Sequence, residues 1–252
     1  MLQGLGIRAL AYDWRDEHIP FFDRELRELK AHDIRMSAIY LLGGWPLNER
    51  DVWDDPQRKA GLEFLKRNAL QIEVWVTYSG EGTEELIDDQ AKYDAAASRI
   101  GVLADLINDL GCRLGIYNHG GWGGKPQTML EIVRRLEAKK VGIVYNFHHG
   151  HEHLDEMPAA FAPMLPYLMC VNLNGTTRGG PKIIPLGRGE EDLGILRMLK
   201  ESGYEGPIGI LDHRMDVDAK LSLRENLAGL QTLLGKIGDD AALATYAEDA
   251  LS

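Results

Sequence analysis

The sequence predicts an α/β protein folded as a (β/α)8 barrel, and three observations support this prediction. Short apolar runs alternate with helical stretches of roughly 10–15 residues, which is the pattern of βαβ units around a parallel sheet. The apolar runs are continuous, as expected for strands that are covered on both faces. No Gly-x-Gly-x-x-Gly turn follows the first strand, so a dinucleotide-binding sheet is disfavoured.

Each predicted strand is short and ends in or just before Gly, Asn, His, Asp or another turn residue. The seven firm strands are Leu5–Tyr12, Met36–Leu42, Ile72–Tyr78, Arg113–Tyr117, Val141–Phe147, Leu168–Leu173 and Ile208–Leu211. An eighth run, Ile183–Leu186, is weak, which leaves an irregular or seven-stranded barrel open.

A helical stretch follows each strand, and the longest of them, Asp88–Leu110, carries apolar residues three and four positions apart, the spacing of one helix face. The helical stretches are Phe22–Ala31, Gln57–Asn68, Asp88–Leu110, Thr128–Lys139, Asp155–Met164, Glu190–Lys200 and Leu221–Leu234. No linker, repeat or low-complexity stretch interrupts the alternation, so residues 1–252 are assigned to a single domain.

Composition excludes some classes of protein. The chain has 39 acidic and 28 basic residues, a net charge of −11, and lacks the basic face typical of nucleic-acid binding. No apolar run approaches the roughly 20 residues that cross a bilayer. The N-terminus has no signal-peptide pattern. We expect a cytoplasmic protein, or an exported one if a leader has been removed, with Cys112 and Cys170 as buried free thiols.

Polar residues gather at the predicted C-terminal strand ends, where barrels of this type place their catalytic groups. Five of the eight histidines lie there, and a sixth, His153, lies just beyond. The strand-end candidates are Tyr12, Asn118, His119, Trp122, Asn146, His148, His149, His151, Asn172, Asn174, Asp212 and His213.

The histidine-rich segment from His148 to His153 is the sharpest of these features. Imidazole binds divalent transition metals and carries protons near neutral pH. His149, nearest the predicted barrel mouth, is the favoured functional residue. The alternative is a solvated loop in which His151 and His153 cap the following helix.

The segment after the fourth strand combines Asn118 and His119 with four glycines around Trp122. Glycines let the backbone approach a ligand closely and leave N–H groups for its oxygens. Trp122, like Tyr12, could pack on the C–H face of a sugar. A tight turn with a stacked tryptophan is the alternative.

Asn172 and Asn174 alternate along one strand and therefore share a face, the interior face in a barrel. Two inward amides are costly unless they bind a ligand or each other. At the last strand, Asp212 and His213 are alternatives for a base or ligand, because only one of them can point inward. Lys182 lies in a Gly-rich loop and is a candidate for a phosphate or carboxylate, or an ordinary surface lysine.

The order of several motifs resembles that of the xylose-isomerase-like TIM barrels, the sugar phosphate isomerase/epimerase superfamily. The motifs are Tyr117-Asn-His119, Val141-Gly-Ile-Val-Tyr-Asn-x-x-His149, Val171-Asn-Leu-Asn-Gly175, Pro185-Leu-Gly-Arg-Gly-Glu-Glu-Asp-Leu193 and Gly203-Tyr-x-Gly-Pro-Ile-Gly-Ile-Leu211. The resemblance covers most of the chain and is best from Gly111 to Leu234. It implies a TIM barrel enzyme of carbohydrate metabolism that moves a proton next to a carbonyl, with a divalent metal held by Glu, Asp, His and Glu.

The carboxylate quartet of that family is not preserved here. The family Asp falls on Asn146, its following His on His149, and the next His on Asn172. The last Glu falls on Leu211, and the first has no clear counterpart. The resemblance therefore leaves two alternatives: a metal (Mn, Zn, Co, Fe or Mg) held by His119, His149 and His213, or no tightly bound metal. Loss of carboxylates favours ions that accept imidazole over Mg²⁺.

The leading hypothesis is a sugar or keto-sugar isomerase or epimerase that acts by proton transfer, with a small-molecule sugar as its partner and its oligomeric state left open. The catalytic candidates are His149, His119 and Asp212. The substrate-binding candidates are Tyr12, Asn118, Trp122, Asn146, Asn172, Asn174 and Lys182. The alternatives are a dehydratase-like lyase or hydratase, a non-catalytic sugar-binding or accessory barrel and, least favoured, a metal-dependent nuclease of the same fold.

Overall fold

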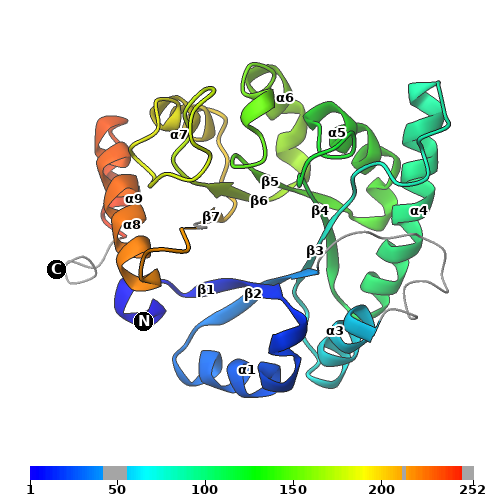
Figure 1. Ribbon diagram of the computed structural model, residues 1–252, viewed down its shortest axis with the longest axis horizontal. Helices are drawn as coiled ribbons and strands as arrows, with labels where there is room; N and C mark the ends of the chain where they lie inside the picture. Colours follow the sequence, from blue (N-terminus) through cyan, green and yellow to red (C-terminus); the bar gives the residue numbers. More distant parts are fainter. Residues whose placement is uncertain (42–55, 212–213, 246–252) are drawn as a thin grey trace. The chain divides into compact units, whose positions relative to one another are not determined.

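The computed structural model describes residues 1–41, 56–211 and 214–245. Seven strands follow one another in the sheet in sequence order, and the described strand pairings are parallel (Figure 1). They are β1 (Ala9–Trp14), β2 (Arg35–Leu41), β3 (Glu73–Thr77), β4 (Arg113–Tyr117), β5 (Gly142–Asn146), β6 (Leu168–Leu173) and β7 (Ile208–Ile210).

Seven strands were firmly predicted, and all seven are present. The weak eighth run, Ile183–Leu186, is not a strand, since Ile184 makes only an isolated antiparallel bridge with Gly175. β1 begins four residues later than predicted. Leu2–Leu5 instead forms a short 3-10 helix that ends at Gly6, whose φ of 73° is readily adopted only by glycine.

Helices separate the strands, as the alternating pattern predicts. The α-helices are α1 (Phe22–Ala31), α3 (Pro56–Arg67), α4 (Asp89–Asp109), α5 (Pro126–Arg135), α6 (Met157–Met164), α7 (Asp192–Glu201), α8 (Ala219–Lys236) and α9 (Asp240–Leu243). Local sequence explains several of their starts. The Asp88 carboxylate accepts hydrogen bonds from the first-turn backbone N–H groups of α4, and Pro126 begins α5 where no N–H partner is needed.

The chain divides into two compact units, which we describe separately. The N-terminal unit comprises Ala9–Val144 and Pro166–Met169. The C-terminal unit comprises Met1–Arg8, Tyr145–Leu165 and the chain from Cys170 onward. The assignment of the whole chain to one domain stays a prediction.

In the N-terminal unit the two faces of the strands differ. One face carries fully buried aliphatic side chains such as Ile39, Val74 and Leu114, and α1 packs on β2 while α4 packs on β4 (Figure 1). The other face carries Tyr40, Trp75 and Tyr117, because these alternate with the aliphatic residues along their strands. The helix-covered face forms the core of this unit.

In the C-terminal unit β6 pairs with β7, and Asn172 lies opposite Gly209. A Cβ atom on Gly209 would lie 2.0 Å from Asn172 Oδ1, so the glycine makes room for the amide. Helices α7, α8 and α9 pack one on the next. Cys170 is a buried free thiol, as is Cys112 in the other unit, which confirms the prediction for both cysteines.

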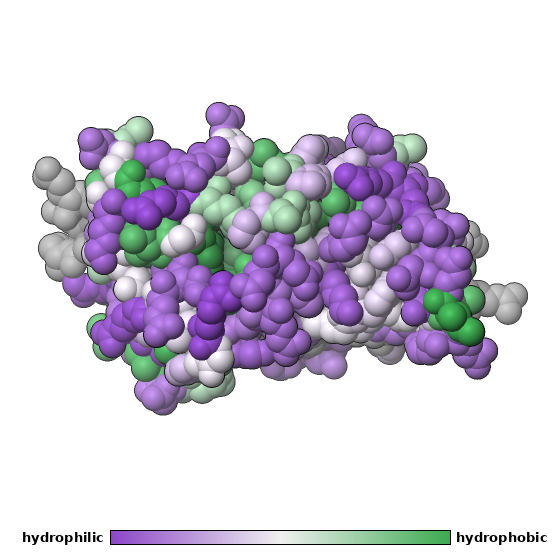
Figure 2. Space-filling view, turned by 90° about the horizontal axis from the view of Figure 1, so that it is seen from above, coloured by the Kyte–Doolittle hydropathy of each residue, from purple (hydrophilic) through white to green (hydrophobic). Residues whose placement is uncertain are grey.

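The face shown in Figure 2 is mostly hydrophilic, with hydrophobic residues in small groups. Among the described helices, none combines the length and the apolar character needed to span a membrane.

Candidate active site

The strand-end residues of the N-terminal unit form an aromatic cluster, which we call the N-terminal cluster: Tyr40, Trp75, Tyr117 and His119. The rings of Tyr40 and Tyr117 are 4.9 Å apart, and the Trp75 and His119 rings each lie 6.3 Å from Tyr117. The Tyr40 hydroxyl is 2.7 Å from Thr77 Oγ1. His119 is exposed at the edge of this cluster, whereas Trp75 and Tyr117 are buried, at 5% and 6% exposure.

His119 lies at a strand end, as predicted, but the three aromatic residues of this cluster were not predicted as site residues. Tyr40, Trp75 and Tyr117 lie within predicted strands, where aromatic residues read as ordinary core. The alternation of side chains along a strand could have identified them, because each lies on the strand face opposite to the aliphatic residues.

The glycine-rich segment after β4 forms a tight turn in which Trp122 is stacked on another ring, which was the alternative to a sugar-binding role for this residue. Its indole stacks on Tyr93 of α4, with ring centroids 5.4 Å apart and an interplanar angle of 19°. A Cβ atom on Gly123 would lie 2.0 Å from the backbone oxygen of Tyr78, so this turn needs glycine for a close backbone approach. Asn118, just before the turn, is 1% exposed.

Tyr12 also lies away from the N-terminal cluster. It pairs with Ile39 in the sheet and therefore points to the helix-covered face. There its ring packs on Phe22 of α1, and its hydroxyl donates a hydrogen bond to the carboxylate of Glu25. Burial, together with this carboxylate, raises the pKa of Tyr12.

In the C-terminal unit, Asn146 organises the turn after β5. Its side-chain oxygen accepts a hydrogen bond from the backbone N–H of His148 (2.9 Å). Its backbone oxygen accepts from the N–H groups of His149 and Gly150 (3.1 Å each). Asn146 is fully buried, and one of its roles is to hold both histidines at the strand end.

His148, Asn174 and Lys182 meet in what we call the C-terminal cluster, together with Asn146 and His149. The Lys182 backbone oxygen lies 2.7 Å from His148 Nδ1 and 3.0 Å from Asn174 Nδ2. The His149 ring is half-buried and lies 4.7 Å from the His148 ring in an edge-on arrangement. Sequence analysis favoured His149 and had no means to single out His148, because its partner is a backbone atom 34 residues away.

Asn172 of β6 and Asn174, the residue just after β6, are buried, at 7% and 5% exposure, as the same-face argument predicts. The Cys170 thiol lies 3.5 Å from Asn172 Oδ1. Asn174 Nδ2 also donates to the backbone oxygen of Gly175 (2.8 Å), whereas Asn174 Oδ1 is buried without a hydrogen-bond partner. A buried acceptor of this kind normally has a donor.

The remaining histidines of the segment differ from each other. His153 Nδ1 lies 3.2 Å from the Glu156 carboxylate, and Glu156 is the residue before α6. Burial, followed by the charges of Lys182 and His148, lowers the pKa of His151. His151 therefore stays neutral at neutral pH.

The Gly-rich loop after β6 is held by Asp192 at the start of α7. The Asp192 carboxylate accepts hydrogen bonds from the backbone N–H groups of Thr176 (2.7 Å), Gly187 (2.6 Å) and Gly189 (2.9 Å). The Lys182 side chain is exposed at the surface of this loop. Arg178, which flanks it, is bound to Asp155 (2.6 Å) and Glu191.

The predicted metal ligands receive limited support. Asp212 and His213 lie outside the described residues. Within the described residues, no group of three or more His, Cys, Asp or Glu side chains is arranged to hold a metal ion. The side chains around Asn146 and Asn172 that could ligate a metal ion are amides and imidazoles. Hard cations are bound mainly by carboxylates, so these side chains do not fit such a cation.

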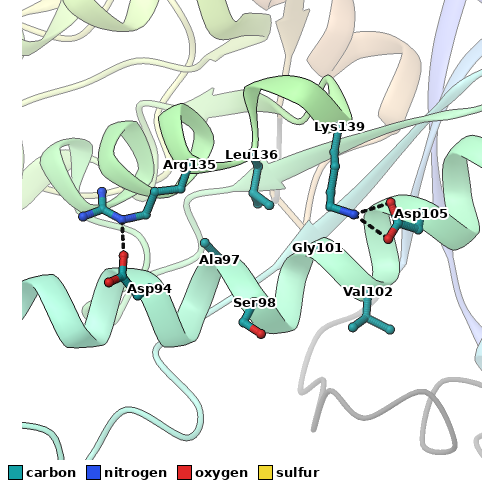
Figure 3. Close-up of a pocket in the computed structure, with 9 residues that line it drawn as sticks. All are labelled: Asp94, Ala97, Ser98, Gly101, Val102, Asp105, Arg135, Leu136 and Lys139. Carbon is teal, nitrogen blue, oxygen red and sulfur yellow. Dashed lines mark hydrogen bonds and ion pairs between the residues drawn. The ribbon is translucent and has the colours of Figure 1, made fainter.

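A surface groove of the N-terminal unit lies apart from these candidates, between α4 and the segment from α5 to Lys139 (Figure 3). Arg135 bonds to Asp94 across one end (2.6 Å), and Lys139 bonds to Asp105 at the other. Its floor includes Ala97, Gly101 and Leu136, none of which carries chemistry. The groove is therefore not a candidate active site.

Residues 4–233 match the protein family described as Xylose isomerase-like TIM barrel. An uncharacterized protein of Methanocaldococcus jannaschii is 26% identical over 166 residues, or 62% of this chain. The chain spans about half (53%) of that relative. It also spans 40% of a solved fusion of a xylose isomerase-like TIM barrel with 4-hydroxyphenylpyruvate dioxygenase, which covers 93% of this chain (TM-score 0.71, 15% identity).

Three further solved structures have the same fold. IOLI protein with a bound zinc atom covers 93% of this chain, which covers 91% of it (TM-score 0.70, 16% identity). D-psicose 3-epimerase of Clostridium cellulolyticum with D-tagatose covers 92% of this chain, which covers 90% of it (TM-score 0.61, 17% identity). The probable 3-DHS dehydratase of Bacillus anthracis covers 91% of this chain, which covers 90% of it (TM-score 0.65, 14% identity). The predicted fold class and family are confirmed.

Proposed function

The chain belongs to the xylose isomerase-like TIM barrel family, and on this premise we propose that it is a sugar or keto-sugar isomerase or epimerase. The reaction is a proton transfer at the carbon next to a carbonyl. The observation that carries the proposal is the C-terminal cluster, where buried amides and oriented imidazoles share one strand-end turn and its neighbouring loop. Amides orient hydroxyl groups, and imidazole moves protons near neutral pH.

We propose His149 as the acid or base, with Asn146, Asn172 and Asn174 orienting hydroxyl groups. His149 lies on the turn that Asn146 holds, and its backbone N–H donates to the backbone oxygen of Asn146. His119 in the N-terminal cluster and Asp212 are proposed as further proton-transfer groups. Epimerases among the structural neighbours support the same reaction class.

The test is turnover of D-psicose, D-tagatose and D-fructose in D2O, followed by NMR. An isomerase or epimerase exchanges a carbon-bound proton for deuterium as the product forms. A general acid or base contributes roughly 10²–10⁴-fold, so His149→Ala should lose turnover by about that factor. His32→Ala, a surface histidine at the end of α1, is the control. Wild-type turnover in folded His149→Ala would refute the assignment.

A lyase that removes water from a keto-sugar is the second candidate, and the likeness to a probable dehydratase supports it. The same NMR experiment separates the two reactions, because elimination yields a product that has lost one water. The absence of the family Asp at Asn146 and of the family His at Asn172 favours a third candidate, a non-catalytic sugar-binding barrel. This protein would bind a sugar without deuterium exchange.

A divalent ion remains a proposal that depends on His213. Elemental analysis before and after chelator treatment measures whether stoichiometric Mn, Zn, Co, Fe or Mg is held. Loss of the ion in His213→Ala together with His119→Ala would support the proposed imidazole set.

A further inference from the structure

Asp13, near the end of β1, lies on the face of the strand opposite to the helix-covered one. It pairs with Tyr40 in the sheet, whereas its neighbour Tyr12 pairs with Ile39 and faces α1. Arg15 follows β1 with an extended backbone (φ −133°, ψ 152°), so its side chain points to the same side as that of Asp13. The strand end therefore presents a carboxylate and a guanidinium next to Tyr40.

Asp13 and Arg15 form an ion pair that a ligand can reach. Arg15 Nε and Nη2 donate to the same carboxylate oxygen, Asp13 Oδ2, at 3.0 and 2.7 Å. The described residues supply no further hydrogen-bond partner for either side chain. The Asp13 side chain is 52% exposed and the Arg15 side chain 37%. Asp13 Oδ1 and Arg15 Nη1 therefore keep hydrogen-bonding capacity for a ligand.

The ion pair adjoins the N-terminal cluster, which contains His119, one of the proposed proton-transfer groups. The Tyr40 hydroxyl is 2.7 Å from Thr77 Oγ1, and the Tyr40 ring lies 6.5 Å from the His119 ring at an interplanar angle of 25°. Burial raises the pKa of Tyr40, and the hydrogen bond with Thr77 lowers it. The charges of Asp13 and Arg15 also act on this pKa, in opposite directions. Tyr40 therefore contacts His119 on one side and lies within the field of the ion pair.

The chemistry of the pair favours a neutral polyhydroxylated ligand. A carboxylate accepts hydrogen bonds from hydroxyl groups, and a guanidinium donates to hydroxyl oxygens. The two charges sum to zero, so the pair offers an anion no net attraction. A phosphate or carboxylate group on the ligand would also be repelled by the Asp13 carboxylate. The pair therefore matches a neutral sugar better than a sugar acid or a sugar phosphate.

We propose that Asp13 and Arg15 are specificity-determining residues that bind hydroxyl groups of a neutral sugar and exclude its anionic derivatives. This rests on the proposed function, since the ligand is the sugar of that reaction. Asp13 accepts a hydrogen bond through Oδ1, and Arg15 binds Oδ2 and orients the carboxylate. Removal of the Asp13 charge leaves Arg15 as an unpaired cation. The change that weakens binding of neutral sugars should therefore strengthen binding of anionic ones.

The test measures the affinity for D-tagatose, D-fructose and D-fructose 6-phosphate by titration calorimetry, and KM for any sugar that is turned over. Asp13→Asn should weaken binding of the two neutral sugars roughly tenfold, the size expected for losing one hydrogen bond to a charged group. It should tighten binding of the phosphate, because Arg15 is then unpaired. Arg15→Gln keeps a donor but removes the cation, so it should bind the phosphate less tightly than the wild type does.

Asp23→Asn is the matched control. Asp23 forms an ion pair with Arg67 (2.8 Å) and has a similar side-chain exposure of 48%, but it lies on α1. This variant should leave all three affinities unchanged. Circular dichroism of each variant checks that a loss of binding is not a loss of fold.

Deuterium exchange by the wild-type protein tests the proposed function separately. Unchanged affinities in Asp13→Asn, in a protein that turns over one of these sugars, would overturn the inference alone. So would equal losses for the neutral sugars and the phosphate, because the charge would then not select the ligand. The expected changes in affinity without turnover or exchange would support the inference and overturn the isomerase proposal. Wild-type protein that binds none of the three ligands would overturn both.

Discussion

Asp192→Asn removes one oxygen from the carboxylate that holds the loop of the C-terminal cluster. In the wild type, one carboxylate oxygen accepts from the N–H of Thr176, and the other accepts from the N–H groups of Gly187 and Gly189. The asparagine oxygen takes the position that accepts from Gly187 and Gly189, and its NH2 group faces the N–H of Thr176. One hydrogen bond is therefore lost, and the other two are made to a neutral acceptor.

The size of the effect follows from the charge and burial of the carboxylate. A hydrogen bond to a charged group contributes about 1.5–3 kcal/mol and one to a neutral group about 0.5–1.5 kcal/mol, so losing one bond and weakening two is worth about 3–6 kcal/mol. Asp192 is 3% exposed, and burial raises its pKa despite the hydrogen bonds from the three N–H groups. Asparagine escapes that cost of burying charge, so we expect a net loss of about 3 kcal/mol at neutral pH, a large share of a typical domain's 5–15 kcal/mol.

The pKa shift also fixes the sign of the pH dependence. Because the folded-state pKa is raised, the contribution of Asp192 is fully present below the unfolded pKa of about 4 and declines as the pH rises through the folded value. The stability difference between wild type and Asp192→Asn should therefore be largest in acid and smaller at pH 7.

Urea unfolding followed by circular dichroism measures this difference, and amide hydrogen exchange at Thr176, Gly187 and Gly189 reports the loop itself. Asp216→Asn is the control, an exposed aspartate of the same unit that should change stability by less than about 0.5 kcal/mol. If Asp192→Asn matched this control and the three amides kept their protection, the carboxylate would not hold the loop as argued.

Three further predictions concern other parts of the chain. Gly209→Ala places a Cβ atom 2.0 Å from Asn172 Oδ1 and should lower the unfolding free energy by about 1–3 kcal/mol in urea, whereas an unchanged midpoint would show that the amide moves aside at little cost. Burial lowers the pKa of His151, so its contribution to stability is present above about pH 6.5 and is lost as the pH falls; parallel Tm–pH curves for wild type and His151→Gln would contradict this. Hydrogen bonds, first from Arg67, lower the pKa of Asp23, so its contribution to stability is present above about pH 4 and is lost below. The stability of Asp23→Asn should therefore fall less steeply with decreasing pH than that of the wild type.

Much of the candidate site could be located from the sequence because strand ends are a local property. The prediction that Asn172 and Asn174 share a buried face needs only the two-residue period of a strand, and both are buried. The placement of His149 after the strand ending at Asn146 follows in the same way. The predictions for Asp212 and His213 fall outside the described residues.

Side-chain direction was harder to predict, because it depends on register and on distant partners. Tyr12 and Asp13 are neighbours on β1, yet only the pairing of Tyr12 with Ile39 shows that Tyr12 faces α1. A one-residue difference in register exchanges the two faces of a strand. Trp122 likewise stacks on Tyr93, which is 29 residues earlier in the chain.

The sequence by itself determined the βα alternation, the family and the strand ends that carry polar groups, since each depends on residues close together in the chain. Only the tertiary structure decided that Ile183–Leu186 is a loop segment instead of an eighth strand. It alone placed the Lys182 carbonyl against His148 and Asn174. Every residue carries the same backbone carbonyl, so residue types do not show which side chains a given carbonyl will contact after folding.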